Sequence, residues 1–302
     1  MSGPPPPGSR LTLATLREWG RLYSNWGRWG DDDELGTLNF LTPERVSGAA
    51  RLARSGLVVS CAWPTDAAAA GEAGAPHGPL HDLPASAAQA PPPCGARWDP
   101  LGGVSYDGVA WNDRPVDALP ARGARAGSID RFCDGVVGRG VLLDLPGRLG
   151  VPWLDDGTRI LPEDLDGCAE ASGVAIETGD ILLVRTGRLS RAFHEGSFAG
   201  YAGGPAPGLS LRCLRWLHER QVAAVASDTA CVEVVPHEVE GCEMPFHRIA
   251  VRDLGLLLGE RFHLDRLAEA CAADGRCAFL FVAPPLPGDG SAGSPLNPVA
   301  VK

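Results

Sequence analysis

The sequence predicts a mixed α/β fold. Four short, nearly continuous apolar runs recur along the 302-residue chain, and such runs are typical of strands that are buried on both faces. Helical patterns separate the runs, and this alternation favours a sheet covered by helices. The apolar runs are residues 141–145, 181–185, 222–226 and 278–282, and the helical patterns cover about 162–172, 209–220 and 264–273. We therefore expect one α/β domain over residues 11–302.

The N-terminal third shows helices first and then a strand. Residues 1–10 are rich in proline and are expected to form a disordered leader. Residues 11–23 carry apolar side chains at helical spacing. A second helix is expected to begin at Thr42, which can cap it, and to end near residue 54. A strand is expected over residues 57–63. An Ala/Pro-rich stretch follows at 65–94, which predicts a long irregular loop or lid.

Composition excludes several classes of protein. The net charge is −10 and no run of basic residues forms a stripe, so nucleic acid is not an expected partner. No apolar run approaches the ~20 residues of a membrane span, and the first residues do not resemble a signal peptide. The nine cysteines are widely spaced without a Cys-x-x-Cys pair, which argues against disulfides and favours a reducing cytoplasm. Phosphate-binding and Gly-x-Ser-x-Gly motifs are lacking, so neither a nucleotide cofactor nor a serine nucleophile is indicated.

Three stretches concentrate polar and special-backbone residues that could carry chemistry. They are residues 95–108, residues 226–229 at the end of an apolar run, and residues 244–248, which are followed further on by Gly259 and Glu260. We expect the segment Cys94–Asp99 to organise the site.

These stretches resemble blocks of the putative cyclase family, whose best-known members are bacterial kynurenine formamidases. Residues 25–39, 138–144, 179–187, 226–229 and 293–298 are similar, in this order, to blocks of its longer-chain branch. The resemblance implies a swivelling β/β/α-type fold, in which a mixed and partly barrel-like sheet is packed by helices. It also implies a homodimer or homotetramer, for which Trp19, Trp26 and Trp29 would suit either an interface or the core.

The metal-binding signature of that family is degenerate in this chain. The signature reads His-x-Gly-Thr-His-x-Asp-x-x-x-His, and it falls on residues 93–103. Its three histidines are replaced by Pro93, Arg97 and Gly103, whereas Gly95 and Asp99 persist. A later His and Glu complete the family's site, and the resemblance places them at His247 and Glu260.

Arg97 changes the chemistry that this site can perform. A guanidinium stays charged and cannot donate a lone pair to a metal, but its fork matches carboxylates. We hypothesise that Arg97 replaces the metal between Asp99 and Glu260, since buried unpaired carboxylates are costly. Without a metal the usual source of hydroxide is lost. Arg97 would then steady an oxyanion, Asp99 would orient it, and His247 or Glu260 would move a proton.

Further candidates have simpler structural interpretations beside the functional ones. Tyr106 is a catalytic candidate that could instead shape a turn. The substrate-binding candidates are Trp98, His81, Asp228 and Arg185. Trp98 could form a pocket wall, Asp228 a turn and Arg185 the end of a core strand. Arg97 and Asp99 could form a structural salt bridge, His247 could be a core histidine at a strand start, and Glu260 could form a surface pair with Arg261. His77 and His81 could lie in a solvated loop. Cys94 could be a small buried residue rather than a nucleophile.

Three functions remain open from the sequence. The first is a metal-independent cyclase, dehydratase or isomerase, a lyase or isomerase acting on a small organic, for example natural-product, intermediate. The second is a metal-dependent amidohydrolase that holds Zn or Mn through Asp99, His247 and Glu260. The third is a non-catalytic protein that binds a metabolite. Arg97 favours the first, and no cofactor is favoured.

Overall fold

The computed structural model describes residues 11–63, 95–116, 127–286 and 296–302. The expected leader, the loop at 65–94, and with them His77, His81, Pro93 and Cys94, lie outside the described residues. The α-helices of the described part are α1 (Leu13–Leu22), α2 (Pro43–Ala50), α4 (Leu145–Leu149), α5 (Pro162–Ala171), α6 (Arg188–Glu195), α7 (Cys213–Glu219), α8 (Pro245–His247) and α9 (Asp265–Asp274). A π-helix, η6 (Arg248–Asp253), continues α8. None of these helices is both long and apolar enough to cross a membrane.

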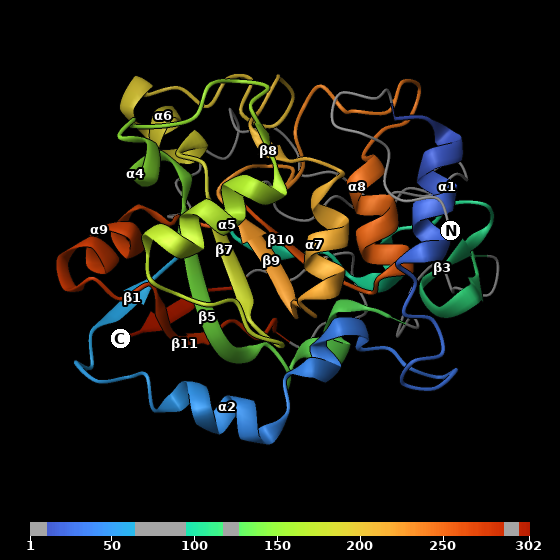
Figure 1. Ribbon diagram of the computed structural model, residues 1–302, viewed down its shortest axis with the longest axis horizontal. Coiled ribbons are helices and arrows are strands. Elements are labelled where there is room, and N and C mark those ends of the chain that lie inside the picture. Colours follow the sequence, from blue (N-terminus) through green and yellow to red (C-terminus); the bar gives the residue numbers. More distant parts are fainter. Residues whose placement is uncertain (1–10, 64–94, 117–126, 287–295) are drawn as a thin grey trace.

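An eight-stranded mixed sheet, curled into a half-barrel, forms the centre of the molecule (Figure 1). Its order is β1-β12-β11-β5-β7-β9-β10-β2. The four strands from β5 to β10 run parallel, and antiparallel strands flank them on both sides. The strands are β1 (Val58–Ser60), β12 (Val299–Val301), β11 (Ala278–Val282), β5 (Val137–Asp144), β7 (Ile181–Arg185), β9 (Ala224–Ser227), β10 (Leu257–Glu260) and β2 (Arg97–Trp98). The predicted mixed α/β fold with a partly barrel-like sheet is confirmed.

Helices and short strand pairs surround this sheet. Helix α2 contacts β5 and β11 and lies below the sheet in Figure 1, whereas α5 contacts β5, α4 contacts β7, and α9 contacts β1 and β5. Strands β7 and β9 are buried almost throughout, as their apolar sequences predict, and β10 is buried as well. Two pairs of short strands lie outside this sheet: β3 (Val109–Ala110) with β4 (Arg114–Pro115), and β6 (Arg159–Ile160) with β8 (Gly208–Leu209).

The predicted elements differ from the observed ones mainly at their ends. Strand β5 begins four residues before the apolar run at 141–145, because Gly140 allows Phe279 and Phe281 of β11 to pack closely against it. The pattern at 209–220 begins as strand β8, and the helix itself starts at Cys213. His247 ends the short helix α8, so it does not lie at a strand start.

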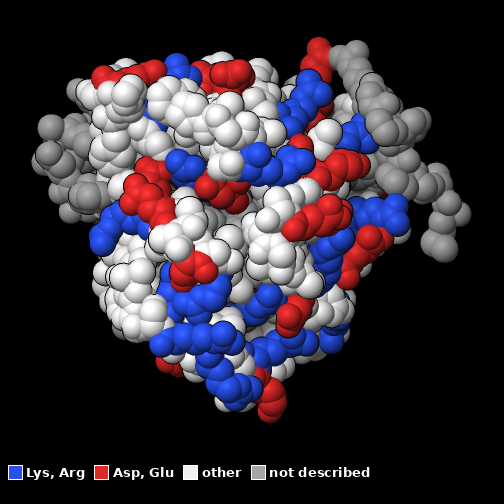
Figure 2. Space-filling model, turned by 60° about the vertical axis from the view of Figure 1, so that its left-hand side comes forward, with Lys and Arg blue, Asp and Glu red and all other residues white. Residues whose placement is uncertain are grey.

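Charges of both signs are mixed on the face shown in Figure 2. Acidic and basic side chains alternate over much of this face, and Lys and Arg gather toward its lower part. This face therefore presents interspersed charge rather than one continuous stripe.

The edge of the sheet brings two distant segments together. Strand β2 pairs antiparallel with β10, so that Arg97 lies opposite Glu260 and Trp98 lies opposite Gly259. A side chain at Gly259 would meet the Trp98 ring, since a Cβ there would lie 2.4 Å from it. Gly259 therefore allows Trp98 to bury completely and to donate from Nε1 to the Ala283 carbonyl at 2.8 Å. This packing holds β2 in register and sets Arg97 beside Glu260.

Candidate functional site

Arg97 lies between two carboxylates. Its Nε and Nη2 donate to Oε2 of Glu260 at 2.9 and 2.8 Å, and Nη2 lies 3.2 Å from Oδ1 of Asp99. Opposed residues of neighbouring strands project from the same face of a sheet, which explains the pairing of Arg97 with Glu260. Asp99 follows two residues after Arg97, and its backbone N–H donates to the Leu258 carbonyl, which keeps it beside the sheet.

This group is buried, and burial alone would lower the pKa of Arg97. The charges of Glu260 and Asp99 outweigh burial, and the pKa of Arg97 rises above its ordinary value. The guanidinium is therefore a permanent positive charge in a site that excludes most water.

The His247 ring lies between Glu233 on one side and the same two carboxylates, Asp99 and Glu260, on the other. Its Nε2 lies 3.5 Å from Oδ2 of Asp99 and 3.5 Å from Oε1 of Glu260. Its Nδ1 lies 2.7 Å from Oε1 of Glu233, which also accepts from the His247 backbone N–H at 3.0 Å. Glu233 thus bonds both the ring and the backbone of His247, and Nε2 is directed toward Asp99 and Glu260.

Three carboxylates determine the protonation of His247. Burial lowers its pKa, but the neighbouring carboxylates of Asp99, Glu233 and Glu260 outweigh burial and raise the pKa well above the ordinary value. Burial raises the pKa of Glu233, yet the rings of His237 and His247 beside its carboxylate lower it to about 2. The directions of both pKa shifts favour an imidazolium at His247 paired with an ionised Glu233.

Comparisons with known proteins identify the family of this chain. Residues 77–234 match a family model described as Putative cyclase. A crystal structure of a novel cyclase is 33% identical, covers 94% of this chain and 99% of its own, and has a TM-score of 0.80. The chain belongs to the putative cyclase family. No curated protein matches it.

Two other solved structures share the cyclase fold. Isatin hydrolase A from Labrenzia aggregata, bound to benzyl benzoate, is 20% identical, covers 87% of this chain and 98% of its own, and has a TM-score of 0.52. Isatin hydrolase A from Ralstonia solanacearum is 18% identical, covers 81% of this chain and 91% of its own, and has a TM-score of 0.55. At these identities the likeness shows the fold alone.

Among the residues that the structure describes, two groups could hold a metal. The donor atoms of Asp99, His247 and Glu260 lie within 4.8 Å of one another, and so do those of Cys231, Glu233 and His247. The first group does not fit a divalent ion well, because Arg97 is bonded to both of its carboxylates. In the second, burial raises the pKa of Cys231 well above its usual value, which keeps the thiol protonated.

Glu233, Cys231 and His237 were not among the residues singled out from the sequence. All three belong to the segment that follows β9, which has no regular secondary structure to give a periodic signal. The one available sign was Glu233 itself, an acidic residue in the otherwise apolar run from Ala230 to Val235.

Tyr106 and Trp98 have well-defined partners in the structure. The Tyr106 hydroxyl donates to Asp253, and the Arg252 guanidinium lies 4.0 Å from the Tyr106 ring. Burial raises the pKa of Tyr106, and the Asp253 charge raises it further. Trp98 is fully buried, and its ring packs 5.0 Å from that of Phe262. The structure thus groups Tyr106 with η6 and Trp98 with the sheet core, and it groups Arg97, Asp99, His247 and Glu260 together.

Asp228 and Arg185 each connect elements of the sheet. The Asp228 carboxylate, directly after β9, accepts from the backbone and hydroxyl of Thr186 and from the Gly187 N–H. Arg185, at the end of β7, pairs with Asp144 at 2.8 Å and with Asp265 at 2.9 Å. Of the tryptophans expected at an interface or in the core, Trp19 is buried in the core, and Trp26 and Trp29 are partly buried and pack against it.

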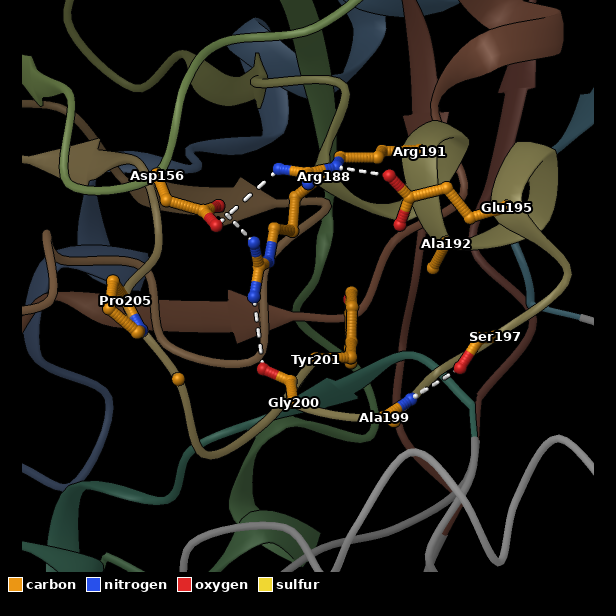
Figure 3. Close-up of a pocket in the computed structure, with 11 residues that line it drawn as sticks. Asp156, Arg188, Arg191, Ala192, Glu195, Ser197, Ala199, Gly200, Tyr201 and Pro205 are labelled. Carbon is orange, nitrogen blue, oxygen red and sulfur yellow. Dashed lines mark hydrogen bonds and ion pairs between the residues drawn. The ribbon is translucent and has the colours of Figure 1, made fainter.

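A cavity of about 190 Å³ lies beside α6 (Figure 3). Arg188 pairs there with Asp156, and Arg191 pairs with Glu195 at 2.8 Å. Its wall includes Tyr201, whose hydroxyl donates to the Asp228 carbonyl. Because both arginines of this cavity are already paired with carboxylates, its charge is balanced within the wall.

Proposed function

We propose that this chain is a metal-independent enzyme of the cyclase family that moves protons on a small organic substrate. The reaction would be a ring closure, dehydration or isomerisation. One observation carries the proposal: the Arg97 guanidinium bonds both Asp99 and Glu260, the carboxylates that a metal at this site would need.

Electrostatics supports Arg97 as the resident cation. A divalent ion about 4 Å from a guanidinium would be repelled by roughly 8 kcal/mol at an effective dielectric constant near 20. The same carboxylates gain charge-assisted hydrogen bonds from Arg97 without that repulsion. Arg97 therefore supplies the positive charge, and the ions that family relatives would use are disfavoured here.

His247 is suited to donate a proton. Its ring is an imidazolium, and Glu233 engages Nδ1, so the proton on Nε2 faces Asp99 and Glu260. A substrate oxygen reaching this point could take that proton while Asp99 or Glu260 accepts one from carbon. Arg97 would stabilise negative charge that develops on the substrate. Together these steps suffice for enolisation, elimination or ring closure without hydroxide.

Metal analysis tests this function directly. The chain should carry far less than one ion per molecule after purification, and added Zn²⁺ or Mn²⁺ should leave its Tm unchanged. Arg97→His restores a ligand where the family has histidine, and this variant should gain one ion and a Tm that rises with Zn²⁺. Arg97→Lys is the matched control, because it keeps the charge and adds no ligand. One tightly held ion in the unaltered chain would refute the proposal.

A metal-dependent hydrolase is the second candidate, and one observation favours it. The donor atoms of Asp99, His247 and Glu260 lie within 4.8 Å of one another, a spacing that could close on a metal if Arg97 moved away. Isatin is the natural probe, since two structures of similar fold are named isatin hydrolases. Ring opening of isatin by the unaltered chain, dependent on added Mn²⁺ or Zn²⁺, would favour this candidate over the first.

A further inference from the structure

One cysteine and the only lysine of the chain meet near β1, the edge strand at the other end of the sheet from β2. Cys271 lies in the last turn of α9, which contacts β1, and Lys302 directly follows β12, which pairs with β1. Helix α9, β1 and the end of the chain marked C lie at the left in Figure 1. Arg97 belongs to β2, so this contact is separate from the Arg97 group. The other basic residues of this chain are all arginines, and a lysine at this place therefore calls for a local reason.

The Lys302 side chain is buried, and its ammonium contacts three different groups. Nζ lies 2.8 Å from Oδ1 of Asp274, and it donates to the Arg276 carbonyl and, at 3.2 Å, to Sγ of Cys271. An ammonium has three N–H groups, so these contacts account for all of them. The Lys302 nitrogen and the Cys271 sulfur are thus in direct contact.

The Lys302 charge affects the reactivity of the Cys271 sulfur. A neighbouring ammonium stabilises the thiolate, the form that attacks peroxides, and so offsets part of the effect of burial. Cys271 is only 3% exposed, but the Asp274 side chain on the same ammonium is 32% exposed. The pair therefore lies one side chain away from solvent, and hydrogen peroxide, a molecule little larger than water, is an oxidant of suitable size.

A second buried thiol shows what Cys271 would be without the amine. Cys213 is fully buried, and its thiol donates to the Ile160 carbonyl at 3.2 Å, the same distance as that between Cys271 and Lys302. A carbonyl oxygen neither stabilises a thiolate nor condenses with a sulfenic acid, whereas a lysine nitrogen can do both. Because Lys302 is the only lysine, Cys271 is the one cysteine of the described residues with a lysine partner.

We propose that Cys271 and Lys302 form an oxidation-sensitive pair, which hydrogen peroxide joins through a sulfur–nitrogen bond. The Cys271 sulfur attacks one peroxide oxygen, the O–O bond breaks, and the departing hydroxide leaves as water with the thiol proton, so that a sulfenic acid remains. The Lys302 ammonium then gives one proton to Asp274, and its nitrogen attacks the sulfur. The S–O bond breaks, and the hydroxyl leaves as a second water with another proton of the same nitrogen.

The product is a sulfenamide that ties the last turn of α9 to the end of β12. The sulfur and nitrogen together lose two electrons, and one hydrogen peroxide gains them. The proton on Asp274 passes to solvent, since this carboxylate is partly exposed. An added dithiol reverses the step by reducing the sulfur–nitrogen bond to the free thiol and the amine.

Peptide mapping of the intact chain tests this assignment. The folded chain is treated with one equivalent of hydrogen peroxide, then unfolded, alkylated and digested with trypsin without reductant. Cleavage after Arg276 separates Cys271 from the peptide that holds both Cys277 and Lys302. We expect the two peptides to be linked, lighter by two hydrogen atoms, and to carry an alkyl group on Cys277. A disulfide between the two cysteines would have the same loss of hydrogen but would leave Cys277 without the alkyl group.

Single variants identify the nitrogen. Lys302→Arg keeps the charge and removes the amine, so it should abolish the link and leave Cys271 as a sulfenic acid that dimedone traps on unfolding. Cys277→Ser is the matched control, and its link should be unchanged and should open with dithiothreitol. Arginine is larger than the lysine that it replaces, so circular dichroism checks the fold of this variant, and the alkyl group on Cys277 decides the question in the unaltered chain as well.

Three results would overturn the proposal. The first is a Cys271 recovered unlinked from the unaltered chain, whether alkylated or oxidised. The second is a link that survives Lys302→Arg or disappears in Cys277→Ser. The third is a linked pair that keeps one oxygen atom, because sulfur and nitrogen would then not be bonded directly. Cys213 should stay fully alkylated throughout, as expected of a buried thiol without an amine partner.

Discussion

Two arginines of this chain each lie between two carboxylates, yet the two groups differ in what surrounds them. Arg97 pairs with Glu260 at 2.8 Å and with Asp99 at 3.2 Å, and Arg185 pairs with Asp144 at 2.8 Å and with Asp265 at 2.9 Å. The side chains of the Arg97 group are 9%, 12% and 0% exposed, whereas those of the Arg185 group are 14%, 27% and 24% exposed. The side chains of the Arg97 group are therefore less exposed to solvent than those of the Arg185 group.

The carboxylates also have different second partners. Asp144 is the N-cap of α4, where Oδ1 accepts from the Gly147 N–H, and Asp265 is the first residue of α9 and accepts from Ser190. Asp99 and Glu260 instead face Nε2 of His247. Helix starts are common places for acidic residues, so the Arg185 group has a structural explanation that the Arg97 group lacks. The partners of the carboxylates, more than the ion pair itself, distinguish a candidate site from a structural clamp.

Replacing each arginine by methionine gives the largest test of this contrast. Arg97→Met leaves two buried carboxylates and should lower the free energy of unfolding at pH 7 by about 3–5 kcal/mol. Arg185→Met leaves carboxylates that still reach solvent and helix N–H groups, so we expect about 1–2 kcal/mol. Urea unfolding measures both. Equal losses would contradict the idea that the deeper burial of the Arg97 carboxylates makes them more costly to leave unpaired.

Glu233→Gln tests the pair that holds His247, with a somewhat smaller expected effect. The folded pKa of Glu233 is about 2, below its ordinary 4.5. Its stabilising contribution is therefore fully present above pH 4.5 and is lost as the pH falls toward 2. We expect a loss of about 3 kcal/mol at pH 7 that shrinks steadily below pH 4.5. Acid titration of unfolding for both proteins checks this, and His237→Gln is the control that keeps the His247 bond. A loss that does not vary with pH would point to packing.

The sequence could predict the sheet better than the site. Long apolar runs such as 181–185 report burial on both faces, which is a local property of the strand. Strand β2 has two residues, and its place depends on pairing with β10 more than 150 residues away, which no local pattern encodes. The resemblance to the cyclase family supplied Arg97, Asp99, His247 and Glu260, because these positions match a motif. Glu233 matches no part of that motif, and it reaches His247 only because the segment after β9 folds back on α8.

The charge on His247 provides a third test through pH. Its folded pKa is raised by Asp99, Glu233 and Glu260, so its contribution is fully present below about pH 6.5 and is lost as the pH rises through the folded pKa. His218 is the contrast, because burial lowers its pKa and its contribution is lost as the pH falls below 6.5. We expect the stability deficit of His247→Gln to fall by up to about 1.4 kcal/mol per pH unit at alkaline pH, with the opposite trend for His218→Gln. Denaturant unfolding between pH 5 and 9 distinguishes them, and parallel trends would mean that His247 is neutral.

Tyr106→Phe has the smallest expected effect, and it decides which group Tyr106 belongs to. The variant removes one hydrogen bond to Asp253, for which we expect about 1 kcal/mol of stability. Since Arg252 still pairs with Asp253, the carboxylate keeps a partner. The NMR titration of His247 should then be the same as in the unaltered chain. A shifted His247 titration would instead join Tyr106 to the Arg97 group and restore it as a candidate for proton transfer, and this result would move the boundary of the site to η6.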